Sequence, residues 1–208
     1  MRELSLVLAT MAAATVFAQE PKKDEPAKKP QWQLVLTGED AKKADQLEQR
    51  IARQEALGNR VRAAEAVAEL LKLKAEKLGA DHWQVVDDRV WLADLRAERT
   101  AEQVKQLQQA TQDANEAVAL NQRRKYAEAI PLLEKALAVR RKVMGEDHPA
   151  TAQSYCDLAH NLEDSGRAAE AAPLFEKALA TFRRVLGENH PDTAVSYGNL
   201  ASNLQARG

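Results

Sequence analysis

Gly145-Glu-Asp-His-Pro-Ala-Thr-Ala152 returns 42 residues later as Gly187-Glu-Asn-His-Pro-Asp-Thr-Ala194. The stretch before it, Ala127-Glu-Ala-Ile-Pro-Leu-Leu-Glu-Lys-Ala-Leu-Ala138, returns at the same distance as Ala169-Glu-Ala-Ala-Pro-Leu-Phe-Glu-Lys-Ala-Leu-Ala180. Aligning residues 124–166 with 166–208 gives 25 identical pairs among 43. Self-similarity at a fixed period is the signature of a solenoid, in which each unit buries its apolar face against its neighbours. The chain is therefore a repeat protein.

Each repeat unit divides into two helices joined by a turn. Gly166 and Gly187 end the two helices, because glycine readily adopts the positive φ that a helix terminus requires. Small alanines at contact positions allow the two helices to approach closely, while leucine and phenylalanine fill the space between them. The pattern predicts an all-α fold of antiparallel helix pairs. The first helix carries its apolar or small residues at the spacing of one helical face, namely at Ala152, Tyr155, Leu158, Ala159 and Leu162.

This pattern resembles the tetratricopeptide repeat (TPR). The 42-residue period and the Gly-Glu-Asp-His-Pro motif are similar to the kinesin-light-chain type. His82-Trp83 followed by an extra helix resembles the amino-terminal region of certain exported bacterial repeat proteins. The resemblance is strong for residues 124–208 and implies a right-handed α-solenoid, a TPR-like superhelix, that binds partners and is not a catalyst. The matching positions are Leu158, Ala159, Leu162, Gly166, Ala171, Phe175 and Ala178.

Composition excludes several classes of function. The 208 residues include 30 basic and 31 acidic side chains, for a net charge of −1, so no overall field attracts nucleic acid. The single cysteine, Cys156, excludes an intrachain disulfide. We expect Cys156 to be a small packing or groove residue, with a free reactive thiol as the alternative.

The first residues have the pattern of an export signal. Residues 1–18 combine Arg2, an uncharged run and small residues before Gln19, which predicts a cleaved signal peptide and an exported protein, periplasmic or secreted. An uncleaved anchor is the alternative; after cleavage we expect no membrane contact. Residues 19–37 form a Pro/Lys-rich linker followed by a short apolar segment, Trp32–Leu36, which either contacts the first helix or forms a brief extended segment.

Residues 38–123 form a degenerate helical repeat region. The spacings Thr37 to Asp40 and Thr100 to Gln103 predict two capping boxes. Helices are expected from residue 38 to 57, from 60 to 78 and from 83 to a break at 98–100, with a further helix to about residue 122. The turn Gly79-Ala-Asp-His82-Trp83 has the pattern of the later turns, with tryptophan in place of proline.

Three histidines occupy equivalent turns between repeats. His82, His148 and His190 each precede a helix, and Pro149 and Pro191 follow at the first helical position, where proline's missing N–H costs nothing. We predict that these residues serve a structural role at the helix N-cap. A solenoid spaces the turns one repeat apart, so we predict no metal site and no cofactor.

The sequence predicts a binding surface and no active site. It contains no nucleotide-binding glycine loop, metalloprotease motif or nucleophile elbow, so we assign no catalytic residue. The family resemblance implies that the first helix of each unit lines the concave face of the solenoid. The implied peptide-binding residues are Gln153, Asp157, His160, Asn199 and Ser202. The alternative is that these are ordinary exposed polar residues without a binding role.

The last repeat is incomplete. The helix predicted at 191–207 has no second helix after it, so Val195, Leu200 and Leu204 are expected to lack the cover that their counterparts have. The sequence therefore favours a scaffold for protein or peptide partners. Two alternatives stay open: an amino-terminal regulatory fragment of a larger enzyme, and a structural protein that self-associates through its open carboxyl-terminal repeat.

Overall fold

The computed structural model describes residues 34–207, and these form eight helices and no strand. The predicted all-α solenoid is confirmed. The predicted signal peptide and most of the linker lie outside the described residues. The helices are α1 (Gly38–Ala56), α2 (Arg60–Leu78), α3 (Trp83–Arg96), α4 (Ala101–Gln122), α5 (Tyr126–Met144), α6 (Pro149–Asp164), α7 (Ala168–Val185) and α8 (Pro191–Ala206).

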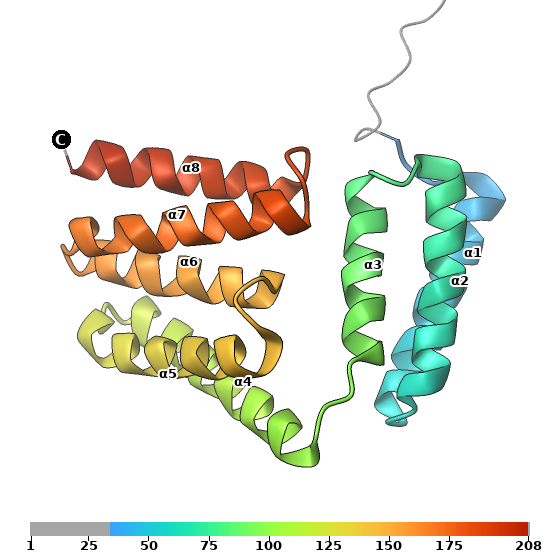
Figure 1. The fold of residues 1–208 in the computed structure, drawn as a ribbon, viewed down its shortest axis with the longest axis horizontal. Helices are drawn as coiled ribbons and strands as arrows, with labels where there is room; N and C mark the ends of the chain where they lie inside the picture. Colours follow the sequence, from blue (N-terminus) through green and yellow to red (C-terminus); the bar gives the residue numbers. More distant parts are fainter. Residues whose placement is uncertain (1–33, 208) are drawn as a thin grey trace, which may run out of the picture.

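The helices form two groups that run in different directions (Figure 1). Helices α1–α3 make an amino-terminal block, and α4–α8 make a repeat stack in which α4 pairs with α5 and α6 with α7. The extended residues 97–100 join the two groups. Because α4 packs against α5, the stack begins at residue 101, whereas the sequence period becomes recognisable at residue 124.

Helix boundaries follow the predicted glycine and capping signals to within about two residues. Thr100 forms the predicted capping box, with its side chain accepting from Gln103 N and the Gln103 side chain accepting from Thr100 N. The capping box predicted at Thr37 is wrong, since its side chain makes no cap hydrogen bond. At that end Glu39 and Asp40 lie in the first turn of α1, where carboxylates favour the positive end of the helix dipole.

Helix α3 contributes to two hydrophobic cores. Leu92 packs with α1 and α2 residues such as Ile51 and Leu70. On the other side of the helix, Val86 joins the core of the repeat stack, which includes Phe175 and Leu133. Thus α3 connects the two groups of helices through burial as well as through the chain.

A set of polar contacts between arginine, glutamate and tyrosine repeats with the 42-residue period of the sequence. Arg141 pairs with Glu146, whose other oxygen accepts from the Tyr155 hydroxyl at 2.7 Å. At the next turn Arg183 pairs with Glu188, which accepts from the Tyr197 hydroxyl at 3.0 Å. Through these hydrogen bonds Tyr155 links α6, and Tyr197 links α8, to the turn that precedes the helix. Burial, followed by the bond to Glu146, raises the pKa of Tyr155 to about 12.

Cys156 is buried on α6. Burial raises the pKa of its thiol to about 11, which disfavours the nucleophilic thiolate. The side chain therefore fits the packing role expected from the sequence.

Candidate binding surface

The first helix of each repeat carries a column of side chains at the 42-residue period. We define the first-helix face as the set of nine such positions on α4, α6 and α8. All nine are exposed or half-buried, and none belongs to the described cores. The nine positions are Thr111, Asn115 and Val118 of α4, Gln153, Asp157 and His160 of α6, and Val195, Asn199 and Ser202 of α8.

The α6 residues of this face are held in place by two different contacts. The Gln153 amide donates to the Asp157 carboxylate at 2.8 Å. The His160 ring lies with its edge toward Phe175, at 4.9 Å between centroids, and so rests on α7. Burial raises the pKa of Asp157, although Gln153 and the nearby Arg140 act in the opposite direction. The carboxylate is thus partly desolvated and can accept a further donor.

The α8 residues lie beside those of α6. Asn199 is half-buried and Ser202 is exposed. Ser196 and Asn199 of α8 act to lower the pKa of the Cys156 thiol on α6, against the larger effect of burial, so the two first helices lie next to each other. Sequence inspection missed Asn115, an exposed α4 residue. It lies 42 residues before Asp157, so extending the period to α4 identifies it.

The three turn histidines all cap the helix that follows. Each is the N-cap residue, and its Nδ1 accepts the backbone N–H two residues on, at 3.3 Å for His82 and 3.1 Å for His148 and His190. Since Nδ1 accepts, the neutral ring carries its proton on Nε2 and donates from there. Pro149 and Pro191 occupy the first helical position after two of these histidines.

The histidine Nε2 atoms connect the repeat stack to the amino-terminal block. His148 donates to Asp94 at 3.2 Å and His190 to Asp87 at 3.0 Å, and both carboxylates lie on α3. The acids are seven residues apart, about two helical turns, so they share one side of α3. We call these two contacts the histidine–aspartate pairs. They were not predicted from the sequence.

Trp83 stands where the later turns have proline, and its contacts explain the difference. Its ring stacks on His82, with 5.7 Å between centroids, and meets the His190 ring edge-on at 6.4 Å. The His82 Nε2 donates to Leu34 O at 3.1 Å, which ties the start of the described chain to this turn. Tryptophan therefore gives the α3 turn a contact with the α8 turn that proline could not make.

Asp94 is half-buried, and its carboxylate accepts hydrogen bonds from Arg99 and His148. Burial acts to raise its pKa, but hydrogen bonds from His148 and Arg99 outweigh burial, and the pKa lies below the ordinary value. A depressed pKa means that the folded protein releases the Asp94 proton more readily than the unfolded chain. The stabilisation is therefore present above the unfolded-state pKa and is lost as the pH falls through the folded-state pKa.

Asp94→Ala should lower the free energy of unfolding by about 1–2 kcal/mol at pH 7, because two hydrogen bonds to a charged group are lost. The difference from the parent protein should shrink as the pH falls below 4. Urea unfolding at pH 7 and pH 3.5 measures both effects. Asp164→Ala, at an exposed acid with no ion pair among residues 34–207, is the control and should change stability by less than about 0.5 kcal/mol. Equal losses in the two variants would contradict the assigned contact.

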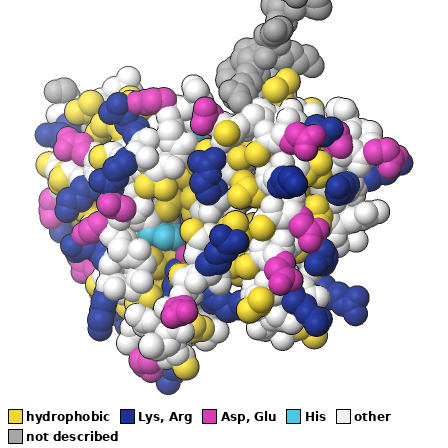
Figure 2. Space-filling model, turned by 45° about the vertical axis from the view of Figure 1, so that its right-hand side comes forward, with side chains coloured by type: hydrophobic (Ala, Val, Ile, Leu, Met, Phe, Trp, Pro, Cys, Tyr) yellow, Lys and Arg dark blue, Asp and Glu magenta, His cyan; other side chains and the backbone are white. Residues whose placement is uncertain are grey.

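A cleft opens where the two groups of helices meet. It has a volume of about 860 Å³ and lies between α2, the end of α3 and the start of α4. Figure 2 shows hydrophobic side chains with Lys and Arg among them on this side of the molecule. An adjoining hollow of about 550 Å³ shares Arg60, Arg99 and Val104 with it and reaches Thr111 on the first-helix face. The cleft therefore borders one end of that face.

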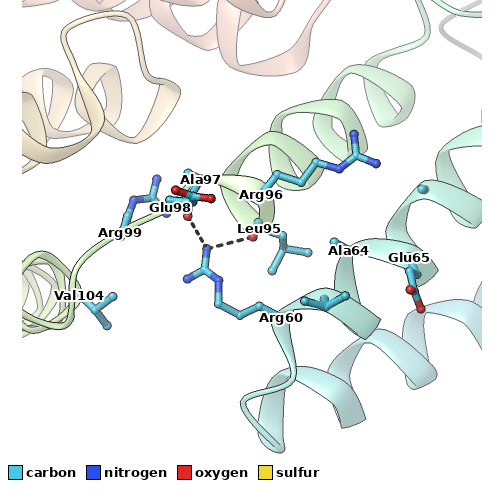
Figure 3. Close-up of a pocket in the computed structure, with 11 residues that line it drawn as sticks. Arg60, Ala64, Glu65, Leu95, Arg96, Ala97, Glu98, Arg99 and Val104 are labelled. Atoms are coloured by element: carbon cyan, nitrogen blue, oxygen red, sulfur yellow. Dashed lines mark hydrogen bonds between the residues drawn. The ribbon is translucent and has the colours of Figure 1, made fainter.

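Arg60 lies at the centre of this cleft and points toward the end of α3 (Figure 3). Its Nη2 donates to Asp94 O at 2.7 Å and to Leu95 O at 3.3 Å, so it satisfies carbonyls that the helix end leaves open. Arg99 bonds the Asp94 carboxylate and Asp94 O. Both arginines thus bind the carboxyl-terminal end of α3, Arg60 from α2 and Arg99 from the segment that follows α3.

Residues 34–207 contain neither a metal-binding cluster nor a membrane-spanning helix. No group of three or more His, Cys, Asp or Glu side chains is placed to hold a metal ion. None of the helices in this range is both long and apolar enough to cross a membrane.

Comparison with known families identifies the repeats. The family model for the tetratricopeptide repeat matches residues 109–183 and 157–208. Residues 109–208 belong to the tetratricopeptide repeat family. The matched range starts within α4, which agrees with the packing of α4 in the repeat stack. The histidine–aspartate pairs join these tetratricopeptide repeats to acids on α3, outside the matched range.

Solved structures that are similar to this chain include proteins from two organisms. A Podosopora anserina protein assigned as a kinesin light chain with nearly identical TPR-like repeats is 21% identical, with a TM-score of 0.46, over 83% of this chain and 90% of its own. BtubC (BKLC) from P. vanneervenii is 17% identical, with a TM-score of 0.47, over 82% of this chain and 68% of its own. No curated protein sequence matches the chain.

Proposed function

We propose that the protein is a non-catalytic scaffold that binds an extended peptide segment of a partner protein on the concave face of its tetratricopeptide repeats. Tetratricopeptide repeats in general mediate protein–protein interactions, and the chain carries them over residues 109–208. The finer proposal depends mainly on one observation, the column formed by Asn115, Asp157 and Asn199 at the 42-residue period.

The chemistry of this column suits a peptide backbone. Asparagine offers both a donor and an acceptor, and an ionised aspartate offers acceptors alone. Asp157 is partly desolvated and takes one donor from Gln153, so a backbone N–H or a basic side chain of the partner would stabilise its charge. We therefore expect the bound segment to be extended and to carry a basic residue opposite α6.

Export is a separate part of the proposal. The export signal predicted over residues 1–18 would place the scaffold in the periplasm or outside the cell, where its partners would also lie. Release of the signal can be checked by mass spectrometry of the protein recovered from each fraction of the producing cell. An amino terminus at Gln19 outside the cytoplasm is the expected result, and an intact Met1 terminus in the cytoplasm would contradict it.

Peptide binding can be tested with a displayed library of random dodecapeptides. A selected peptide of known sequence should bind the parent protein and lose about three- to tenfold in affinity to each of Asn115→Ala, Asp157→Asn and Asn199→Ala. The two alanine variants each remove a hydrogen-bonding amide, and Asp157→Asn removes the charge of the acceptor. Glu176→Gln, on the exposed side of α7, is the matched control and should bind as the parent does. A peptide whose affinity falls with Glu176→Gln but not with the three column variants would place binding on the second helices and overturn the proposal.

A further inference from the structure

Helix α8 repeats the buried face of α6 without its cover. The two helices are 42 residues apart and carry the same residue at five core positions. In α6, Tyr155 is 3% exposed and Leu162 is 5% exposed. Their counterparts Tyr197 and Leu204 are 43% and 54% exposed. The five pairs are Ala152 and Ala194, Tyr155 and Tyr197, Leu158 and Leu200, Ala159 and Ala201, and Leu162 and Leu204.

Helix α7 supplies the cover on α6. It runs antiparallel beside α6 (Figure 1), and its buried residues share one core with those of α6. That face alternates small and aromatic residues, and Lys177 lies over the Tyr155 ring at 5.4 Å from its centroid. The residues of α7 that are nearly inaccessible to solvent are Ala171, Phe175, Ala178 and Phe182.

The counterpart surface on α8 is already folded. We define the α8 face as Ala194, Tyr197, Ala201 and Leu204. Leu200 beside it is half-buried against the core of the repeat stack, and Asn203 donates to Glu163 Oε1 and Ala168 O at 3.0 Å each. The helix is therefore fixed against the stack through its other sides. Arg183 of α7 lies over the Tyr197 ring at 5.9 Å from its centroid. Among the described residues no helix covers the rest of the α8 face, as the sequence predicted for Leu204.

We propose that the α8 face binds an amphipathic helix of a partner protein whose buried side has the α7 pattern. In that pattern two alanines are seven residues apart. An aromatic residue or leucine follows four residues after the first alanine, and a lysine directly precedes the second alanine, as in Ala171, Phe175, Lys177 and Ala178. The alanines would lie against Ala194 and Ala201, and the lysine would approach the Tyr197 ring as Lys177 approaches Tyr155. This inference is independent of the proposed concave-face function.

A partner helix fits this face better than a second copy does. In the described residues, the helices that carry the pattern are α5 and α7, and both bury their alanines within their own pairs. A second copy could offer such a helix only after one of these pairs opened. In α8 itself Ala194 and Ala201 are seven residues apart, but Gly198 stands where the pattern requires an aromatic residue or leucine, and Leu200 stands where it requires lysine. Two α8 faces therefore do not match each other as α6 and α7 do.

A synthetic peptide of residues 167–186, which contains α7, is the direct probe. Labelled peptide should bind the full chain saturably at one per molecule. Leu204→Asp should weaken binding at least about tenfold, because it places a charge where a leucine is buried in the α6 counterpart. Val195→Asp is the matched control on the same helix, since Val195 is 60% exposed on the first-helix face; it should leave the affinity unchanged. A peptide with Phe175→Asp should not bind.

Three results would overturn the proposal. Absence of binding by the parent protein would show that α8 is not a receptor for such a helix. Loss of binding in Val195→Asp but not in Leu204→Asp would place the peptide on the first-helix face instead. Concentration-dependent mass of the unliganded protein that disappears in Leu204→Asp would show that a second copy occupies the face.

Discussion

Lys74→Met should lower the free energy of unfolding by about 3–5 kcal/mol at pH 7, because it leaves the Asp88 carboxylate buried without its counter-ion. The two side chains are 9% and 7% exposed, and Lys74 Nζ lies 3.1 Å from Asp88 Oδ2. They join α2 to α3, and Glu48 of α1 is a weaker third member at 3.4 Å. Methionine has a similar length, so the expected loss is electrostatic and not one of packing.

The loss should depend on pH. Burial raises the pKa of Asp88, and Lys74 opposes that rise. A raised folded-state pKa means that the folded protein binds the proton more tightly than the unfolded chain does. Stability from this group is therefore greatest below the unfolded-state pKa and falls as the pH rises through the folded-state pKa. Without Lys74 this dependence becomes steeper, so the deficit should be smaller at pH 5 than at pH 7.

Urea unfolding of the parent, Lys74→Met and the double variant Lys74→Met/Asp88→Leu separates the explanations. The double variant should recover to within about 1 kcal/mol of the parent, since apolar replacement of a buried pair is often neutral. A neutral Lys74→Met would show that the carboxylate is solvated. A double variant as unstable as the single one would show that shape at this site matters more than charge.

Ala159→Leu should destabilise the protein by about 1–3 kcal/mol through overpacking of α6 against α7. Ala159 is fully buried, and the added atoms would have to displace neighbours such as Phe175. The repeat supplies its own control in Ala201, the same residue 42 positions later on the exposed side of α8. Ala201→Leu should change stability by less than about 0.5 kcal/mol.

Thermal and urea unfolding of these two variants compare the same substitution in two environments. Equal effects at the two positions would mean that burial does not decide the outcome. Helix propensity cannot produce the expected contrast, because alanine and leucine differ little as helix formers. A neutral Ala159→Leu would show that the register assigned to the α6–α7 contact is wrong. The expected contrast would instead show that burial by α7 distinguishes the two positions.

Local features of the fold were largely predictable because they depend on neighbours in sequence. The helix boundaries follow Gly145 and Gly187, whose positive φ ends one helix, and the Thr100 capping box, which begins another. Thr37 has the same spacing of residues but forms no side-chain cap. A capping motif offers a hydrogen bond that the backbone need not use where other groups in the first turn stabilise the same helix end.

The candidate binding surface was predictable in part. The period places Asp157 and Asn199 at equivalent positions, and the same period adds Asn115 once α4 is known to start the stack. The partial desolvation of Asp157 and the contact of His160 with Phe175 depend on the packing of α6 against its neighbours. Spacing alone does not give those quantities.

The sequence by itself determined the all-α repeat architecture, because a 42-residue period and apolar faces at helical spacing leave few other ways to bury the chain. It also determined the turn histidines as helix caps, since capping joins residues two positions apart. Only the tertiary structure decided what the other ring nitrogen of His148 and His190 contacts, since Asp94 and Asp87 are 54 and 103 residues away. Such pairs form because α3 lies against the turns that precede α6 and α8, and that placement depends on the packing of two cores against a single helix.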